Sequence, residues 1–363
     1  MMNRSNATCL LALVCLAALL ASCTMSHDGQ VPARRFTIDV LNRHTPVKNQ
    51  GRGSTCWIYA MLATIETDRI MQGDSVNLSP DYMARRLLER QYSRHVLSGG
   101  TSYVGCRGVM PDLLWLLGEC GAMPFNSYST VRVSDAPAAD MSLLARKTKA
   151  MARKAVNLSA EPQRFERLLT TMLDESLGHL PPHVFMLGAE YTPEEFGRSV
   201  CRPSDYAVVT SFTHRPYNRL IDLELPDNRR HNLFLNVPLD SLLAATVGAV
   251  VRGCGVCWEG DVSEPGFSFS RGVAVADGCP RPTPQLRQRL FETRKTTDDH
   301  CMEIVGLAHD DDNRRYFILK NSWGTGNPYK GLMYMSEDYF LLKTIAVCYR
   351  SNSPYSTCEK RDE

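Results

Sequence analysis

The pattern of hydrophobic and polar residues changes along the chain, from helical spacing in the first half to strand-like spacing in the second. Apolar residues spaced as on one helix face predict a helix over 55–71, and a Ser-Pro pair marks the start of another over 79–92. A third, strongly apolar helix is predicted over 111–119. Apolar residues at i, i+3, i+4 and i+7 predict further helices within 135–178.

Strand-like segments dominate from about residue 205. Apolar runs separated by polar or Gly/Pro-rich turns predict strands over 208–213, 220–225, 302–308, 316–321 and 332–335. The segment 239–251 is interpreted as a helix that runs into a strand. Helices that come first and strands that come last predict an α+β protein with two halves.

Composition limits the class of protein. The chain has 363 residues, of which 44% are hydrophobic and 22% charged, and these proportions are typical of a globular protein. A formal net charge of +2 argues against a nucleic-acid-binding surface spread over the whole molecule, so no nucleic acid partner is expected.

The N-terminus has the character of a targeting segment. An uncharged apolar run over 9–21 is too short to span a bilayer and is typical of a signal peptide. The run ends in Leu20-Ala21-Ser22-Cys23, which resembles a bacterial lipobox and implies cleavage before Cys23 and lipidation of this residue. We therefore expect a signal peptide over 1–22, a tether over 23–45 and a bacterial cell-envelope protein attached to the membrane by its lipid. The alternative is an ordinary secretory signal that is cleaved at a nearby small residue.

Ten cysteines remain after Cys23, and an exported chain permits disulfides whose pairing the sequence does not determine. Cys254-Gly255-Val256-Cys257 has the spacing of a redox or metal motif. On a strand, however, residues i and i+3 face opposite sides, which favours core or separately paired thiols over a metal or dithiol site.

The first candidate for chemistry is the stretch 46–57, where a glycine-bearing turn leads into a helix with Cys56 in its first turn. Free N–H groups and the positive end of the helix dipole favour a thiolate at such a position. Gln50, six residues earlier, could aim an amide donor at the same place and form an oxyanion hole with a backbone N–H. The alternative is a buried structural cysteine.

Two later motifs supply possible partners for this thiol. His300 begins a predicted strand, and Asn321 opens the motif Asn321-Ser322-Trp323-Gly324. An Asn side-chain oxygen can accept a hydrogen bond from one imidazole N–H and leave the other ring nitrogen to face a thiol. Trp323 could shield this bond from water. Cys301 is expected to face away from His300 on the strand, into the core.

Three motifs of this chain resemble the pattern of the papain-like cysteine peptidases. In chain order they are Gln–x5–Cys-Trp, Asp-His and Asn-Ser-Trp-Gly. The resemblance implies a two-lobed α+β fold, with the cysteine in a helical lobe and the histidine and asparagine in a β-rich lobe. It implies Cys56 as nucleophile, His300 as general base and then acid, Asn321 as the residue that orients His300, and Gln50 with the Cys56 N–H as oxyanion hole. It implies hydrolysis of peptide substrates through a thioester acyl-enzyme, with no metal or organic cofactor.

The spacing refines this resemblance. His300 follows Cys56 by 244 residues, against roughly 130–150 in papain and the cathepsins. The chain therefore resembles the bleomycin hydrolase and aminopeptidase C branch, which carries a helical insertion, here at about 135–200 of a peptidase domain over 46–350.

This branch implies an aminopeptidase, a homo-hexamer and a C-terminal tail, here 351–363, that enters the cleft. An endopeptidase with an open cleft and a catalytically silent binding lipoprotein are the alternatives. One departure is Gly53, where papain and many relatives have a cysteine, so the corresponding disulfide is absent.

Overall fold

The structure is a computed structural model that describes residues 34–130, 139–158, 162–186, 188–276, 278 and 281–351, without the side chains of 162–163. The chain from Arg35 onward forms one compact unit. The expected signal peptide, Cys23 and nearly all of the expected tail lie outside the described residues, as does Cys279.

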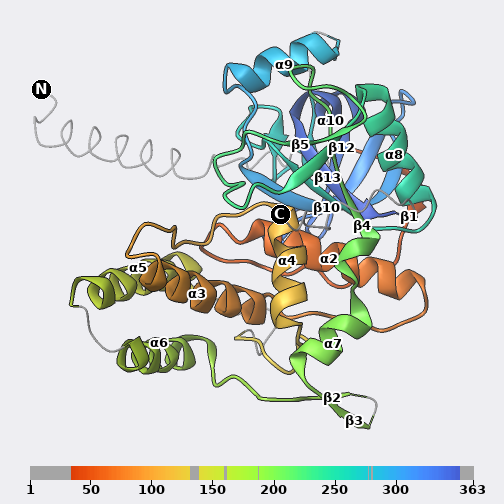
Figure 1. Cartoon of the computed structure of the whole chain (residues 1–363). Coiled ribbons are helices and arrows are strands. Elements are labelled where there is room, and N and C mark those ends of the chain that lie inside the picture. Colours follow the sequence, from red (N-terminus) through yellow and green to blue (C-terminus); the bar gives the residue numbers. More distant parts are fainter. Residues whose placement is uncertain are drawn as a thin grey trace, which may run out of the picture. The chain divides into compact units, whose positions relative to one another are not determined.

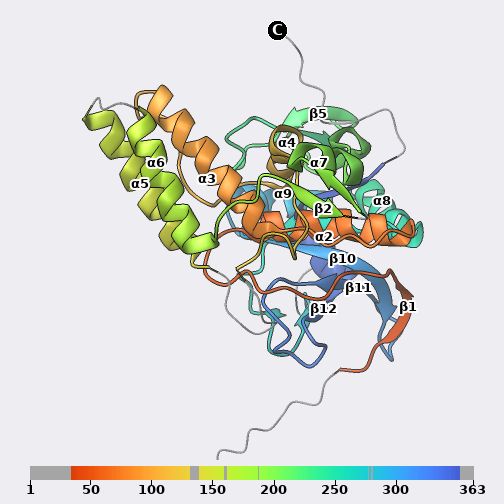
Figure 2. The same ribbon diagram turned by 90° about the horizontal axis from the view of Figure 1, so that it is seen from below.

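The first half of this unit is helical. It contains α2 (Cys56–Met71), α3 (Pro80–Leu97), α4 (Met110–Cys120), α5 (Met141–Asn157), α6 (Pro162–Leu177) and α7 (Pro193–Val200), with a hairpin of β2 (Val184–Met186) and β3 (Ala189–Tyr191) before α7. Ser79 caps α3 as predicted, because its side chain accepts a hydrogen bond from the Tyr82 N–H. Helices α3, α5 and α6 pack side by side (Figures 1 and 2).

The second half forms one large mixed sheet. Its strands run in the order β5 (Arg219–Asp222), β6 (Leu233–Asn236), β4 (Tyr206–Thr210), β13 (Thr344–Arg350), β7 (Val256–Gly260), β10 (His300–His309), β11 (Arg315–Lys320), β12 (Leu332–Ser336), β9 (Val273–Ala274) and β8 (Phe267–Ser268), and β1 (Thr37–Leu41) also pairs with β10. The short helix η1 (Pro203–Asp205) precedes β4, and α8 (Leu239–Val251), α9 (Pro284–Glu292) and α10 (Glu337–Lys343) belong to this half. The predicted α+β class is therefore confirmed.

One predicted element is wrong in part. The segment 239–251 is helical throughout, and the next strand, β7, begins only at Val256. The buried positions of α8 are Leu239, Leu242, Thr246, Ala249 and Val250. They recur with the helical period, so a strand over the same residues would expose half of them.

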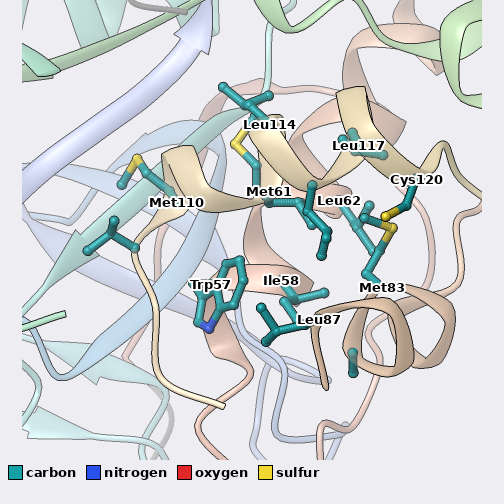
Figure 3. Packing of buried hydrophobic residues seen from close by; sticks show 14 of the residues in the cluster. Trp57, Ile58, Met61, Leu62, Met83, Leu87, Met110, Leu114, Leu117 and Cys120 are labelled. Atoms are coloured by element: carbon teal, nitrogen blue, oxygen red, sulfur yellow. The ribbon is translucent and has the colours of Figure 1, made fainter. Parts of the chain in front are cut away.

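Helix α2 lies between the sheet and the other helices of the first half (Figures 1 and 2). It is buried around most of its circumference from Trp57 to Asp68, and not along a single face as its apolar spacing predicts. Figure 3 shows Trp57, Ile58, Met61 and Leu62 of α2 among apolar side chains of α3 and α4. A helix that is buried on all sides is held in one position by packing.

Buried polar residues fix α2 along its length. The Glu66 carboxylate, which is fully buried, accepts hydrogen bonds from Thr45 Oγ1, Lys48 Nζ (2.6 Å) and the Leu78 N–H (2.7 Å). Two residues further on, Asp68 accepts hydrogen bonds from Tyr206 Oη (2.7 Å) and the Gly255 N–H (3.0 Å). These bonds tie α2 to both halves of the chain.

We predict that Glu66→Ala lowers the free energy of unfolding by about 3–5 kcal/mol, because it removes the buried carboxylate partner of the Lys48 ammonium and the acceptor of the Leu78 N–H. Denaturant titration measures the change. Glu166→Ala on α6, where the glutamate is exposed, serves as control and should change stability by no more than about 0.5 kcal/mol. Equal effects of the two substitutions would contradict the prediction.

Candidate active site

Cys56 is the first residue of α2 and is partly exposed. No side chain caps this helix, so its first N–H groups and the positive end of its dipole are available to a negative charge. The turn before it includes Gly51 at φ 60°, a backbone conformation that glycine adopts without strain. The predicted arrangement of glycine-bearing turn, cysteine and helix start is therefore present.

The structure places His300 and Asn321 together, as predicted. His300 opens β10, Asn321 follows β11, and the two strands are neighbours in the sheet. His300 Nε2 lies 2.9 Å from Asn321 Oδ1, which leaves Nδ1 for the Cys56 thiol. The Trp323 ring is 4.6 Å from the His300 ring between centroids, so it covers the imidazole.

Gln50 lies in a loop that pairs with the segment around Trp323. The Gln50 N–H donates to the Ser322 carbonyl oxygen (2.8 Å), and Ser322 Oγ donates to Gln50 Oε1 (2.6 Å). Gln50 Nε2 donates one hydrogen bond to the Gly53 carbonyl oxygen (2.9 Å). Because the side-chain oxygen is held by Ser322, the amide N–H₂ end is fixed toward the turn that precedes Cys56. Sequence reasoning missed Ser322, whose only signal was its place inside the Asn-Ser-Trp-Gly motif.

The pKa values of the two central groups shift in opposite directions. The pKa of the Cys56 thiol lies well below its ordinary value because the Cys301 side chain hydrogen-bonds to it, and His300 adds to this effect against the opposing effect of burial. Burial alone would lower the pKa of His300, but contact with Cys56, the hydrogen bond to Asn321 and the charge of Asp299 raise it. These directions favour a thiolate–imidazolium ion pair.

Cys301 is buried and faces away from His300, as predicted. The sequence alone did not predict which residue Cys301 contacts on that face of the strand. Because α2 covers this side of β10, the Cys301 thiol meets Cys56 and donates a hydrogen bond to it. Burial keeps the pKa of Cys301 well above its usual value, so this thiol stays protonated as a donor. Cys254 and Cys257 are both free thiols.

Helix α5, which lies in the segment predicted to be a helical insertion, begins against the turn that carries the site. A Cβ atom on Gly53 would lie 2.9 Å from Met141 Cβ at the start of α5, and the Ser142 N–H donates to the Arg52 carbonyl oxygen (3.3 Å). The Cys106 thiol donates to the Met141 carbonyl oxygen (3.3 Å). The start of α5 thus supports this turn at the position where the resemblance predicts that a disulfide is absent.

Within the described segments, no three His, Cys, Asp or Glu side chains are arranged to hold a metal ion. None of the helices in these segments is long and apolar enough to cross a bilayer.

The model of the Peptidase C1-like family matches residues 185–350, which include His300 and Asn321. Aminopeptidase W from Lactobacillus delbrueckii subsp. lactis is 28% identical over 169 residues, a match that covers 43% of this chain and 38% of the relative. Aminopeptidase E from Lactobacillus helveticus is 26% identical over 144 residues and is covered to 33%. The matches to aminopeptidases W and E therefore span only about a third of the length of these two relatives. Aminopeptidase C from Lactobacillus delbrueckii subsp. lactis is 22% identical over 350 residues, a match that covers 81% of this chain and 77% of the relative.

The crystal structure of PepW from Lactobacillus rhamnosis is similar in fold, with a TM-score of 0.67 and 17% sequence identity. The likeness covers 97% of this chain and 92% of PepW, so it includes both halves of the molecule. Together these matches confirm the resemblance drawn from the sequence motifs: residues 185–350 match the Peptidase C1-like family, and the fold is papain-like.

Proposed function

We propose that the protein is a cysteine peptidase that hydrolyses peptide bonds at Cys56 through a thioester acyl-enzyme, and that it acts as an aminopeptidase. The observation that carries this proposal is the contact of Cys56 with His300, whose other ring nitrogen is held 2.9 Å from Asn321 Oδ1. A thiol at a helix start, a histidine and an orienting amide form a nucleophile, its base and the group that fixes the base.

The same geometry supports each step of the reaction. The Cys56 thiolate attacks the peptide carbonyl carbon, and the Cys56 N–H and the Gln50 amide donate hydrogen bonds to the developing oxyanion. The His300 imidazolium gives its proton to the leaving amine as the C–N bond breaks, which leaves a thioester and a neutral imidazole. His300 then takes a proton from water, the resulting hydroxide attacks the thioester, and the thiolate leaves with the acid product released.

The aminopeptidase mode is supported by the relatives, since the four curated proteins that match are named aminopeptidases W, E, G and C. Endopeptidase activity is the alternative, and substrates with a free or a blocked amine separate the two modes. The hexamer expected from the sequence resemblance stays a prediction.

We predict that Cys56→Ala lowers kcat by at least about 10⁴-fold on a fluorogenic peptide amide, because no other group replaces the nucleophile. A biotinylated iodoacetamide should label Cys56 in the wild-type protein, with the site mapped by mass spectrometry. The control is Cys254→Ala, which removes a free, half-buried thiol outside the site. A loss of kcat far smaller than this in Cys56→Ala, or labelling that maps to another cysteine, would refute the assignment.

We also predict that Cys56 reacts with iodoacetamide well below the pH at which an ordinary thiol ionises, which is about 8.5. The physical reason is its lowered pKa, so the alkylation rate should begin to fall only when the pH drops through that lowered value. His300→Ala should move the inflection to higher pH. Peptidase activity should in turn decline as the pH rises through the raised pKa of His300, because the imidazolium loses the proton that the leaving amine needs. An alkylation profile that is the same with and without His300 would contradict the ion pair.

We further propose that the chain is attached to the bacterial cell envelope through lipidation of Cys23, on the basis of the lipobox-like sequence. Cells grown with an alkyne-tagged palmitate should incorporate the label into the wild-type protein and not into Cys23→Ser. Cys358→Ser, which changes a cysteine at the other end of the chain, serves as control and should retain the label. Labelling of Cys23→Ser at the wild-type level would rule out this anchor.

A further inference from the structure

A buried carboxyl group lies beside the candidate nucleophile. Glu259 on β7 is paired directly with Cys301 on β10, so both side chains share one face of the sheet. Because Cys301 contacts Cys56 on that face, Glu259 lies next to the start of α2. The Cys56 side chain is close enough to Glu259 for its negative charge to raise the pKa of this carboxyl group.

Glu259 has no visible structural reason to be a carboxylic acid. It is only 2% exposed, and none of the described residues supplies a hydrogen bond to its Oε2 atom. Burial raises its pKa well above the usual value, and the charges of Asp298 and Cys56 raise it further. A buried carboxyl oxygen without a hydrogen-bond partner destabilises a fold, so its presence beside a reactive thiol points to a partner that arrives from outside.

A second carboxyl group, that of Asp298, is close enough to Glu259 for its charge to raise the pKa of Glu259. Asp298, two residues before His300, lines a cavity of about 510 Å³ together with Asp299. Its Oδ2 atom is buried and, within the described chain, has no hydrogen-bond partner. Burial and the charge of Asp227 raise the pKa of Asp298 to about 6.

Two nearby arginines, Arg107 and Arg229, are engaged by Asp227. Arg107, also on the cavity wall, donates to Asp227 Oδ2 (2.6 Å) and to the backbone carbonyl oxygen of Asp298 (3.4 Å). Arg229 donates to the other oxygen of Asp227 (2.6 Å). Asp227 is thus bound by two guanidinium groups, whereas Glu259 and the buried oxygen of Asp298 are not.

We propose that Glu259 and Asp298 form a subsite that binds a positively charged nitrogen group of the peptide substrate next to the scissile bond. The inference rests on the proposed peptidase function and adds its substrate class. An ammonium group brings N–H donors to oxygens that lack them and a charge that offsets two carboxylates. The group is either the α-ammonium of the substrate's first residue or the side chain of a lysine on the N-terminal side of the cleaved bond.

Four coumarylamide substrates distinguish these two sources of the ammonium group. All four have the same residue X immediately before the cleaved bond. X is chosen from a panel of substrates that the wild-type protein hydrolyses. The four substrates are X-amide with a free amine, acetyl-X-amide, acetyl-Lys-X-amide and acetyl-norleucyl-X-amide. Norleucine matches the lysine side chain in shape but carries no charge. If the subsite binds the α-ammonium, kcat/KM for the free amine exceeds that for acetyl-X-amide. If it binds a side chain, the lysyl substrate exceeds the norleucyl one.

We expect one of these two ratios to be about 10–100 in the wild-type protein, as for a hydrogen bond to a charged group. Glu259→Gln should bring that ratio close to one, and Asp298→Asn should lower it in the same direction. The isosteric Glu166→Gln on α6 is the control and should leave the ratio unchanged. Because Asp298 is partly exposed, Asp298→Asn keeps the test decisive if Glu259→Gln does not fold.

Two ratios near one in the wild-type protein would overturn the subsite, as would a ratio that survives both substitutions. In either case, continued hydrolysis and labelling of Cys56 would leave the peptidase function intact. Absence of hydrolysis of the whole panel, together with an unlabelled Cys56, would instead overturn the peptidase function and the subsite with it.

Discussion

The contact between the start of α2 and the start of β10 is the constraint on which the rest of the structure depends. Cys56 and His300 come from different halves of the chain, and each is the first residue of its element. Their thiol and imidazole meet only because α2 is packed against β10 and β7 along its length. The buried bonds of Glu66 and Asp68 hold the helix in register with both halves. Small movements of α2 would therefore change the distance between the Cys56 thiol and the His300 imidazole.

The loop before Cys56 is held from two sides. Gln50 is bonded to Ser322 in the β-rich half, and Gly53 packs against Met141 at the start of the helical insertion. A rigid turn matters because an oxyanion hole acts through donors that are already oriented when charge develops. The insertion, remote in sequence from Cys56, thus contributes to the geometry around it.

Two tendencies compete around the thiol. Cys301 and His300 favour the negative form of Cys56, whereas the Glu259 carboxyl beside it disfavours a second negative charge in the same buried space. In the free protein the conflict is eased because burial raises the pKa of Glu259, which favours its neutral form. A cationic substrate group would allow both charges to exist together, and this is the physical link between the subsite and the chemistry.

The order of elements, the α+β class and the identity of the motif residues could be predicted from the amino-acid sequence, because helix spacing, cap residues and strand runs are local signals. The sequence also determined which groups lie at helix and strand starts, such as Cys56 and His300. It misjudged 239–251, where local apolar character suits both helix and strand and the buried face decides between them. The folded structure was needed to show that α2 is buried on nearly all sides, that Cys301 meets Cys56, that Ser322 holds Gln50 and that Glu259 lies beside the site. These contacts join residues that are tens to hundreds of positions apart, and they arise from strand pairing and helix packing that no local pattern encodes.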